Sequence, residues 1–303
     1  MEFVQQGEQA AMSRKHPIIA VTGSSGAGTT TVKTALAHIF ERVNAKAAFV
    51  AGDSFHRYDR AEMKREIAQA NEENRVLSHF GPEANLFDRQ LQLFKSYGET
   101  GSGEIRQYLH DEHEAAAYGQ EPGTFTAWEP IPAYTDLLFY EGLHGGVVTD
   151  GIDMAEHVDL LIGVAPTINL EWIQKIYRDT MHRGYKTEEV MHTIYRRMYD
   201  YMHYIVPQFS RTHINFQRIP IVDTSNPFVA RDVPTLDQSL VLIHFLKPKP
   251  DVEYKLHLKG LIEGSTITGF NTLVIPGGKM MYAMELILTR RILELMDGRG
   301  RLG

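Results

Sequence analysis

The segment VTGSSGAGTTTV, Val21 to Val32, constrains this chain more than any other stretch of its sequence. It follows the short apolar run HPIIA and leads into residues with helical spacing at Val32, Leu36 and Ile39. A buried strand, a glycine-rich loop and a helix in this order form a phosphate-binding unit, in which backbone N–H groups and the helix N-terminus face the anion. The sequence therefore predicts an α/β protein with a nucleotide site in this loop.

The loop lacks the lysine of the usual pattern G-x-x-x-x-G-K-[ST]. Two glycines keep the spacing, and a threonine stands in the lysine position. The loop residues expected to contact the nucleotide are Gly23, Ser24, Ser25, Gly26, Ala27, Gly28, Thr29 and Thr30. The hydroxyl of Thr30 is also a candidate Mg²⁺ ligand. The alternative is a glycine-rich turn without a ligand, but the strand before it and the helix after it favour a nucleotide site.

Apolar runs and helical spacings alternate along the rest of the chain. Strands are expected at 16–23, 46–52, 137–146, 158–165 and 218–227, with further apolar segments at 240–246 and 270–275. Helices are expected at 30–42, 60–74, 86–97, 169–183, 187–204 and 279–296, with a loop at 98–104 and irregular chain at 119–136. This alternation predicts a P-loop NTPase-like fold with a mixed, mostly parallel sheet, flanking helices and lid-like helical insertions. We expect a single domain over residues 15–303 after a disordered extension, residues 1–14.

Composition excludes several classes of function. The net charge of −7 gives no support for a nucleic-acid or membrane partner, so an anionic substrate requires a local cluster of cations. The chain has no cysteine, which excludes disulfides, thiolate zinc sites and thiol switches. It also lacks an apolar run long enough to span a membrane and a secretion signal, so a cytoplasmic location is expected.

The segment GDSFHRYDR follows the second expected strand and carries Asp53, His56 and Arg60. Loops at the carboxyl ends of parallel strands hold the ligands in open α/β folds. A carboxylate in this loop is a candidate base for a substrate hydroxyl, and the histidine and arginines are candidates to hold an anion. The alternative is an aspartate that caps the next helix, with solvated arginines.

Glu141 ends the apolar strand LLFYEG. A carboxylate at this position matches the second acid that orients the metal ion in phosphate-loop enzymes. The alternative is a strand-end carboxylate that accepts hydrogen bonds from backbone N–H groups. His144, shortly after it, is interpreted as a residue of local structure rather than a metal ligand.

The expected helix 169–183 carries a charged face with Lys175, Arg178, Asp179 and Arg183 at helical spacing. Such faces are often only solvated. Here three cations surround one acid in a protein that needs cations for phosphate. Lys175 is therefore the candidate for the charge that the loop lacks, and Lys33, one turn into the first helix, is its rival.

Six segments together resemble the bacterial type of the phosphoribulokinase family: HPIIAVTGSSGAGTTTV, GDSFHRYDR, LLFYEGLHGG, INLEWIQKIYRD, IVPQFSRTHINFQR and VDTSNPF. The resemblance covers the chain from His16 onward, and a lysine-free loop is itself a trait of that family. It implies an adenylate-kinase-like fold and an ATP- and Mg²⁺-dependent kinase. The implied reaction transfers the γ-phosphoryl group to O1 of D-ribulose 5-phosphate, giving D-ribulose 1,5-bisphosphate and ADP in the Calvin cycle.

The same resemblance implies roles for single residues. Asp53 is implied as the base and a metal ligand, Lys175 as a contact of the ATP phosphates, and Glu141 and Asp179 as metal-associated acids. The residues implied to contact the sugar phosphate are His56, Arg60, Arg178 and Arg183. A homo-octamer, activation by NADH and inhibition by AMP are implied as well.

Two alternatives remain at this point. A uridine-kinase-like nucleoside kinase shares the loop architecture, but the cluster of arginine and histidine suits a substrate that already carries phosphate. A non-catalytic nucleotide-binding regulator is the other, and the acids Asp53 and Glu141 argue against it.

Overall fold

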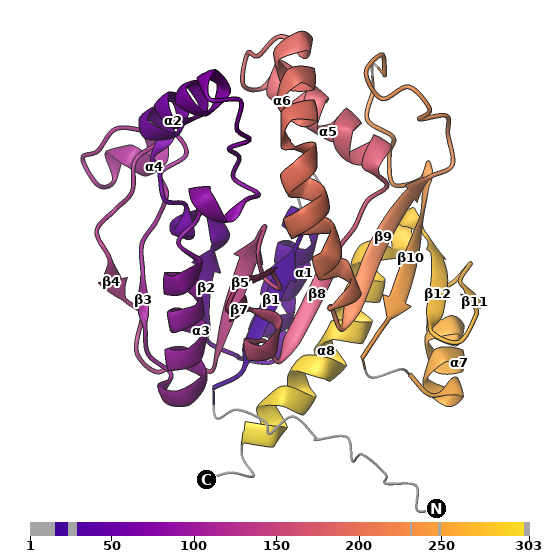
Figure 1. The fold of residues 1–303 in the computed structure, drawn as a ribbon. Coiled ribbons are helices and arrows are strands. Elements are labelled where there is room, and N and C mark those ends of the chain that lie inside the picture. Colours follow the sequence, from indigo (N-terminus) through magenta and orange to yellow (C-terminus); the bar gives the residue numbers. More distant parts are fainter. Residues whose placement is uncertain (1–15, 24–28, 231, 248–249, 300–303) are drawn as a thin grey trace, which may run out of the picture.

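A mixed sheet of eight strands forms the centre of the protein (Figure 1). The structure is a computed structural model and describes residues 16–23, 29–230, 232–247 and 250–299. The strand order is β11-β12-β10-β9-β8-β1-β5-β2. The pairings from β9 to β2 are parallel, and those from β9 to β11 are antiparallel. The predicted α/β fold with a mixed sheet is therefore confirmed, while the predicted extension, residues 1–14, lies outside the described residues.

The parallel strands are β1 (Ile18–Thr22), β2 (Ala47–Ala51), β5 (Leu137–Gly142), β8 (Leu160–Val164) and β9 (Ile214–Pro220). The strands that extend the sheet beyond β9 are β10 (Ser239–Phe245), β11 (Thr266–Thr268) and β12 (Thr272–Pro276). Two small two-stranded sheets join β3 (Glu104–Ile105) to β4 (Glu129–Pro130) and β6 (Val148–Thr149) to β7 (Ile152–Asp153).

The α-helices are α1 (Thr29–Arg42), α2 (Arg60–Glu72), α3 (Phe87–Thr100), α4 (Glu112–Ala116), α5 (Ile168–Met181), α6 (Thr187–Asp200), α7 (Val252–Leu261) and α8 (Met280–Arg299). A π-helical turn, Tyr201–Ile205, follows α6. Short 3₁₀ helices lie at Gly52–Phe55, Pro82–Ala84, Ala155–His157, Val206–Ser210 and Gly277–Lys279. No helix among the described ranges is both long enough and apolar enough to cross a membrane.

Alternation along β1 explains why its sequence is apolar without a break. Ile19 and Val21 face a core shared with α1 and α8, whereas Ile18 and Ala20 face a second core shared with α3. Because successive side chains of a strand point to opposite faces, a strand covered on both faces needs apolar residues at every position. The sheet is therefore the middle layer of three, with α1 and α8 on one face and α3 on the other (Figure 1).

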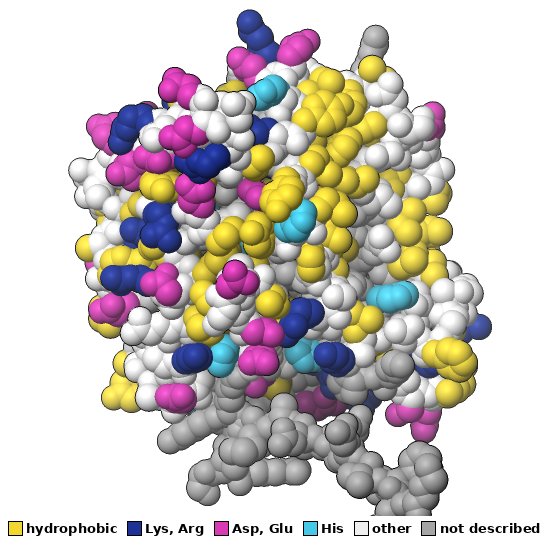
Figure 2. All heavy atoms as spheres, in the orientation of Figure 1, with side chains coloured by type: hydrophobic (Ala, Val, Ile, Leu, Met, Phe, Trp, Pro, Cys, Tyr) yellow, Lys and Arg dark blue, Asp and Glu magenta, His cyan; other side chains and the backbone are white. Residues whose placement is uncertain are grey.

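Helices α2, α5 and α6 project beyond the carboxyl ends of the parallel strands (Figure 1). The surface over α2 mixes charges of both signs, and apolar side chains gather over α5 and α6 (Figure 2). Met181, Tyr195 and Tyr199 are among the exposed large side chains of that helix pair, while Lys175 and Asp179 are largely buried. The helix pair therefore buries part of its charge while it also leaves several large apolar side chains exposed.

Three expectations at the ends of elements were wrong. The strand expected at 218–227 is Ile214–Pro220, and the polar residues after it form a turn in which Asp223 accepts a hydrogen bond from the Ser225 N–H. Helix α3 runs three residues into the expected loop and ends where Gly101 adopts a left-handed φ of 71°. The helix expected to reach residue 204 stops being α-helical at Asp200.

Two α-helices were missed altogether, the five-residue α4 and the longer α7. Residues between the two apolar segments of the tail form α7, whose N-terminus is capped by Asp251 through a 2.6 Å hydrogen bond from the Tyr254 N–H. Only Lys255 and Leu258 of this helix are buried. Its apolar stripe is therefore too narrow for a periodicity argument to detect.

Candidate active site at the carboxyl edge of the sheet

Three predicted site segments meet at the carboxyl edge of the parallel strands. Glu141 on β5 lies in register with Val21 on one side and Ala51 on the other. The phosphate loop begins directly after β1, and Asp53 follows β2 by two residues. The end of β1 is joined to β5 by a hydrogen bond from the Gly23 N–H to the Gly142 carbonyl. The fold thus brings the loop start, Glu141 and Asp53 to one edge.

Glycines allow the chain around Asp53 to approach β5 closely. A Cβ placed on Gly52 would lie 2.8 Å from the Cα of Gly142, and one on Gly142 would lie 2.7 Å from the Cα of Gly52. Real Cβ atoms do not come so near a backbone, so both positions require glycine. In the segment GDSF, packing therefore requires Gly52, while Asp53 is the candidate for the chemistry.

The loop residues Ser24, Ser25, Gly26, Ala27 and Gly28 lie outside the described residues. The backbone of Thr29 and Thr30 forms the first residues of α1. The predicted order of strand, loop and helix is thus present on both sides of the loop, and the nucleotide contacts of the loop itself remain predictions.

Asp53 is flanked by two histidines. Its Oδ1 lies 3.1 Å from His56 Nε2, and its Oδ2 lies 3.5 Å from His110 Nε2. Burial raises the pKa of Asp53, but the hydrogen bond and charge of His56 and the charge of His110 outweigh burial and hold that pKa well below its ordinary value. The side chain is still 37% exposed, so an ionised carboxylate is presented to a ligand.

Residues that the sequence analysis missed hold this carboxylate and its partners in place. His110 comes from the segment between β3 and α4, and His79 packs on the ring of His56 with centroids 4.2 Å apart. Burial lowers the pKa of His79 well below its ordinary value, so His79 is neutral. Arg106 donates to the backbone carbonyls of Ser54 and His56. These residues lie far from Asp53 in sequence and belong to no recognised motif, so the sequence near Asp53 gave no indication of them.

Arg60 lies close to the same group. It is the first residue of α2, which Asp59 caps through a reciprocal capping box with Glu62. The Arg60 guanidinium donates to the carbonyl of His110 at 2.7 Å. Of the two explanations for GDSFHRYDR, helix capping therefore falls to Asp59 and leaves Asp53 free of that task.

A second cluster surrounds Asp179 on α5. Lys175 Nζ lies 2.5 Å from Asp179 Oδ2, and Oδ1 pairs with Arg178 Nε at 3.0 Å and with Arg183 NH1 at 3.3 Å. Burial raises the pKa of Asp179, but Lys175 and Arg178 outweigh it and the net effect is a lowered pKa. One buried carboxylate thus gathers three cations, which share its charge and leave a net positive group.

Lys175 is held more firmly than its rival. Its side chain is only 14% exposed, and burial together with the charge of Arg197 lowers its pKa to about 8 despite the nearby Asp179. Lys33 is exposed on α1. The loop lies outside the described residues, so the choice of Lys175 over Lys33 as the substitute for the loop lysine stays a prediction.

The groups between the two clusters also interact. The charges of Asp53 and Arg197 both act on the pKa of His79, which packs on His56. The charge of Asp179 acts in turn on the pKa of Arg197. The Arg197 guanidinium lies over the ring of Phe80, 5.5 Å from its centroid. His144 donates from Nε2 to the Phe80 carbonyl, and burial lowers the pKa of His144 to about 3, in keeping with a local structural role. The two clusters therefore belong to one electrostatic region.

Mg²⁺ suits the carboxylates at this edge. Asp53 and Glu141 are both partly exposed, and Mg²⁺ is usually held by one or two carboxylates together with substrate phosphates and waters. No group of three or more histidine, aspartate or glutamate side chains within the described ranges forms a complete metal site. The donor set fits a metal ion that arrives with a nucleotide.

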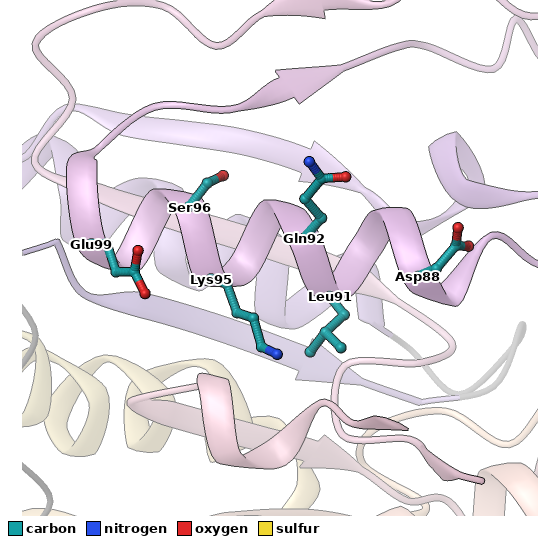
Figure 3. Close-up of a pocket in the computed structure, with 6 residues that line it drawn as sticks. All are labelled: Asp88, Leu91, Gln92, Lys95, Ser96 and Glu99. Carbon is teal, nitrogen blue, oxygen red and sulfur yellow. The ribbon is translucent and has the colours of Figure 1, made fainter. Parts of the chain in front are cut away.

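Surface pockets lie elsewhere. One runs along α3 and is lined by Asp88, Leu91, Gln92, Lys95, Ser96 and Glu99 (Figure 3). A second shares Leu91 and Lys95 with it and extends over residues 148–157. Neither pocket contains a predicted site residue. The candidate active site is therefore located from the side-chain clusters around Asp53 and Asp179, and not from the shape of a pocket.

Comparison with known proteins decides the family. The sequence profile of the Phosphoribulokinase / Uridine kinase family matches residues 18–225. The chain belongs to this family. Members of the phosphoribulokinase / uridine kinase family are kinases, so this protein is a phosphotransferase, and its matched region includes the phosphate loop, Asp53, Glu141 and the α5 cluster.

Several individual relatives are similar over nearly the whole chain. The chain is 58% identical to "Phosphoribulokinase, chromosomal" of Cupriavidus necator over 292 residues, which is 96% of this chain and 99% of that protein. It is 57% identical to a phosphoribulokinase of Xanthobacter flavus over 293 residues, covering 96% of this chain and all of that protein (100%). The solved structure of phosphoribulokinase from Rhodobacter spheroides matches with a TM-score of 0.85 and 48% identity, covering 94% of this chain and 99% of that one.

Proposed function

We propose that the protein is a phosphoribulokinase, which transfers the γ-phosphoryl group of ATP to O1 of D-ribulose 5-phosphate and releases D-ribulose 1,5-bisphosphate and ADP. In this role it serves the Calvin cycle. The observation that carries the proposal is 58% identity over 96% of the chain to a protein of that name. The geometry agrees, since an ionised carboxylate flanked by histidines lies at the edge where the phosphate loop begins, and three cations gather around Asp179 on α5.

In the proposed reaction Asp53 accepts the proton of the O1 hydroxyl. The O1 oxygen forms a bond to the γ-phosphorus while the bond from phosphorus to the β,γ-bridging oxygen breaks. Phosphoryl transfer depends chiefly on alignment and charge stabilisation, so a base of low pKa suffices when it is well placed. Lys175 neutralises charge on the ATP phosphates. Mg²⁺ would be held by Asp53, Glu141 and Thr30, with Asp179 as a further associated acid, and would supply positive charge to the phosphates.

Recognition of the sugar phosphate is assigned to His56, Arg60, Arg178 and Arg183. Arginine offers two parallel N–H donors to a phosphate, which a nucleoside without phosphate does not need. This argument favours ribulose 5-phosphate over uridine as the acceptor. The contact of Arg60 with the carbonyl of His110 supports the assignment, because the His110 ring faces Asp53.

Further proposals concern cofactors and assembly. ATP and Mg²⁺ are the expected cosubstrate and metal, NADH the activator and AMP the inhibitor, and the protein is expected to form a homo-oligomer, an octamer by resemblance. Residues 15–303 are expected to form one kinase domain, since strands from both halves of the chain join one sheet. The cytoplasmic location stays a prediction.

A coupled assay of ADP release tests the function. Purified protein is supplied with MgATP and one of three acceptors: ribulose 5-phosphate, uridine or none. We expect release that depends on ribulose 5-phosphate. Release with uridine alone would favour the nucleoside kinase, and binding of ATP with no release under any condition would favour the regulator.

A further inference from the structure

A buried asparagine stands behind His56 on the side away from Asp53. Asn85 is 2% exposed, and its Oδ1 lies 2.9 Å from His56 Nδ1. The backbones of the two residues form an isolated antiparallel bridge, with hydrogen bonds from the Leu86 N–H to the Phe55 carbonyl and from the Arg57 N–H to the Ala84 carbonyl. The asparagine is thus fixed beside the loop that carries Asp53.

The orientation of the Asn85 amide is decided by its other contacts. Its Nδ2 donates to the carbonyls of His79 at 3.0 Å and Gly81 at 2.6 Å. Carbonyl oxygens only accept, so both amide hydrogens are used there and the atom that faces His56 is the oxygen. A flipped amide would place two carbonyl oxygens against Oδ1 and lose both hydrogen bonds.

This orientation determines which nitrogen of His56 donates to Asn85. Because Oδ1 can only accept, Nδ1 of His56 is the donor. The other nitrogen, Nε2, lies 3.1 Å from a carboxylate oxygen, Oδ1 of Asp53. Asn85 therefore fixes the proton on Nδ1 and turns the Nε2 edge of the ring toward the Asp53 carboxylate.

We propose that Asn85 is a positioning residue for the kinase reaction: by accepting a hydrogen bond from Nδ1, it holds the His56 ring with Nε2 against Oδ1 of Asp53 and leaves Oδ2 to accept the substrate proton. The inference rests on the proposed function, in which Asp53 is the base. Asn85 itself does not touch the substrate. Oδ2 is the oxygen on the side of the half-exposed His110, where a ligand has access.

Two substitutions separate this role from a structural one. Asn85→Leu removes both the acceptor and the donors of the amide, whereas Asn85→Asp keeps an acceptor for His56 Nδ1 and loses only the donors to the loop carbonyls. Loss of a partner that orients a functional histidine typically costs about 10- to 100-fold. We expect Asn85→Leu to lower kcat/KM for ribulose 5-phosphate by this amount, with the KM for ATP changed less than about twofold, and Asn85→Asp to keep at least about ten times the value of Asn85→Leu.

The variants Asn85→Leu and Asn85→Asp, each combined with His56→Ala, provide the internal control. There the two variants should agree within about twofold, because coupling disappears when the partner is absent. Equal losses for Asn85→Leu and Asn85→Asp in the native background, or an unchanged difference without His56, would overturn the proposal. Asn271→Leu is the matched control for fold, since Asn271 also donates to a buried backbone carbonyl, that of Phe245, far from the site.

A measurement without any change at Asn85 covers the case in which these variants do not fold. ¹⁵N NMR of the histidine-labelled protein, with His56 assigned from the His56→Ala difference, should show a protonated Nδ1 at neutral pH. An unprotonated Nδ1 would refute the proposal. If wild-type protein releases no ADP with ribulose 5-phosphate, the proposed function fails, while the ¹⁵N result still decides the state of His56.

Discussion

Raising the pH above 8 should remove the charge of Lys175, the proposed substitute for the loop lysine. In the proposed role Lys175 acts in its protonated form, and burial with the charge of Arg197 lowers its pKa from 10.5 to about 8. As the pH rises through this value the side chain loses its charge, so the contact with the ATP phosphates weakens on the alkaline side. The apparent second-order constant kcat/KM for ATP reports the protonation state of the free enzyme and is therefore the quantity to measure.

The magnitude follows from the pKa. With a pKa of about 8, roughly 90% of Lys175 is charged at pH 7 and roughly 10% at pH 9. The value of kcat/KM for ATP should therefore fall about tenfold between pH 7 and pH 9 and about tenfold again for each further unit. A lysine with the ordinary pKa of 10.5 would stay almost fully charged at pH 9 and produce no such fall.

The assay is coupled ADP release at saturating ribulose 5-phosphate and low ATP, in buffers of constant ionic strength, with circular dichroism to verify the fold at each pH. Lys175→Arg keeps the charge to above pH 12, so its profile should stay level to about pH 10 even if its overall rate is lower. Lys33→Met, the matched change at the rival position, should retain the fall near pH 8. A level wild-type profile to pH 9.5, or the same fall in Lys175→Arg, would refute the assignment of Lys175.

Other changes test the remaining assignments. Asp53→Asn removes the proton acceptor but keeps the shape, and steady-state assays should show kcat lower by about 10²- to 10⁴-fold; a kcat near the wild-type value would remove Asp53 from proton transfer. Arg60→Gln should lower kcat/KM for ribulose 5-phosphate about 10- to 150-fold through a lost charge-assisted contact, with the KM for ATP nearly unchanged. Equal, small changes in both KM values would instead make Arg60 a surface arginine. Because the chain has no cysteine, dithiothreitol or a mild oxidant should leave activity unchanged over minutes, and inactivation reversed by a dithiol would contradict this expectation.

The parts of the site that the sequence predicted correctly in space are local ones. Residues four apart on one helix lie on the same face, so the gathering of Lys175, Arg178 and Arg183 around Asp179 follows from helical geometry once α5 is recognised. Strands β1, β2 and β5 have apolar runs that end at a glycine, which placed Asp53 and Glu141 at the same edge. The roles of these residues in the reaction remain predictions.

The surroundings of Asp53 had no such local signal. His56 is paired by Asn85, 29 residues later, and Arg106 reaches the same loop from about 50 residues away. Asn85 directly follows the short 3₁₀ helix Pro82–Ala84, and Arg106 and His110 follow the two-residue strand β3. The segments that carry them therefore have no continuous periodicity. Their side chains meet only because the chain returns to the edge of the sheet.

The amino-acid sequence by itself determined the strand–loop–helix unit, the missing loop lysine, the absence of thiol chemistry and the family, because these depend on residue type and on periods of two or 3.6 residues. Only the tertiary structure decided which nitrogen of His56 faces Asp53, which side chains shift the pKa of Lys175, and that Asn85 stands behind the site. Those properties depend on distances of about 3 Å between residues far apart in the chain, and such distances are set by how the loops pack on the finished sheet.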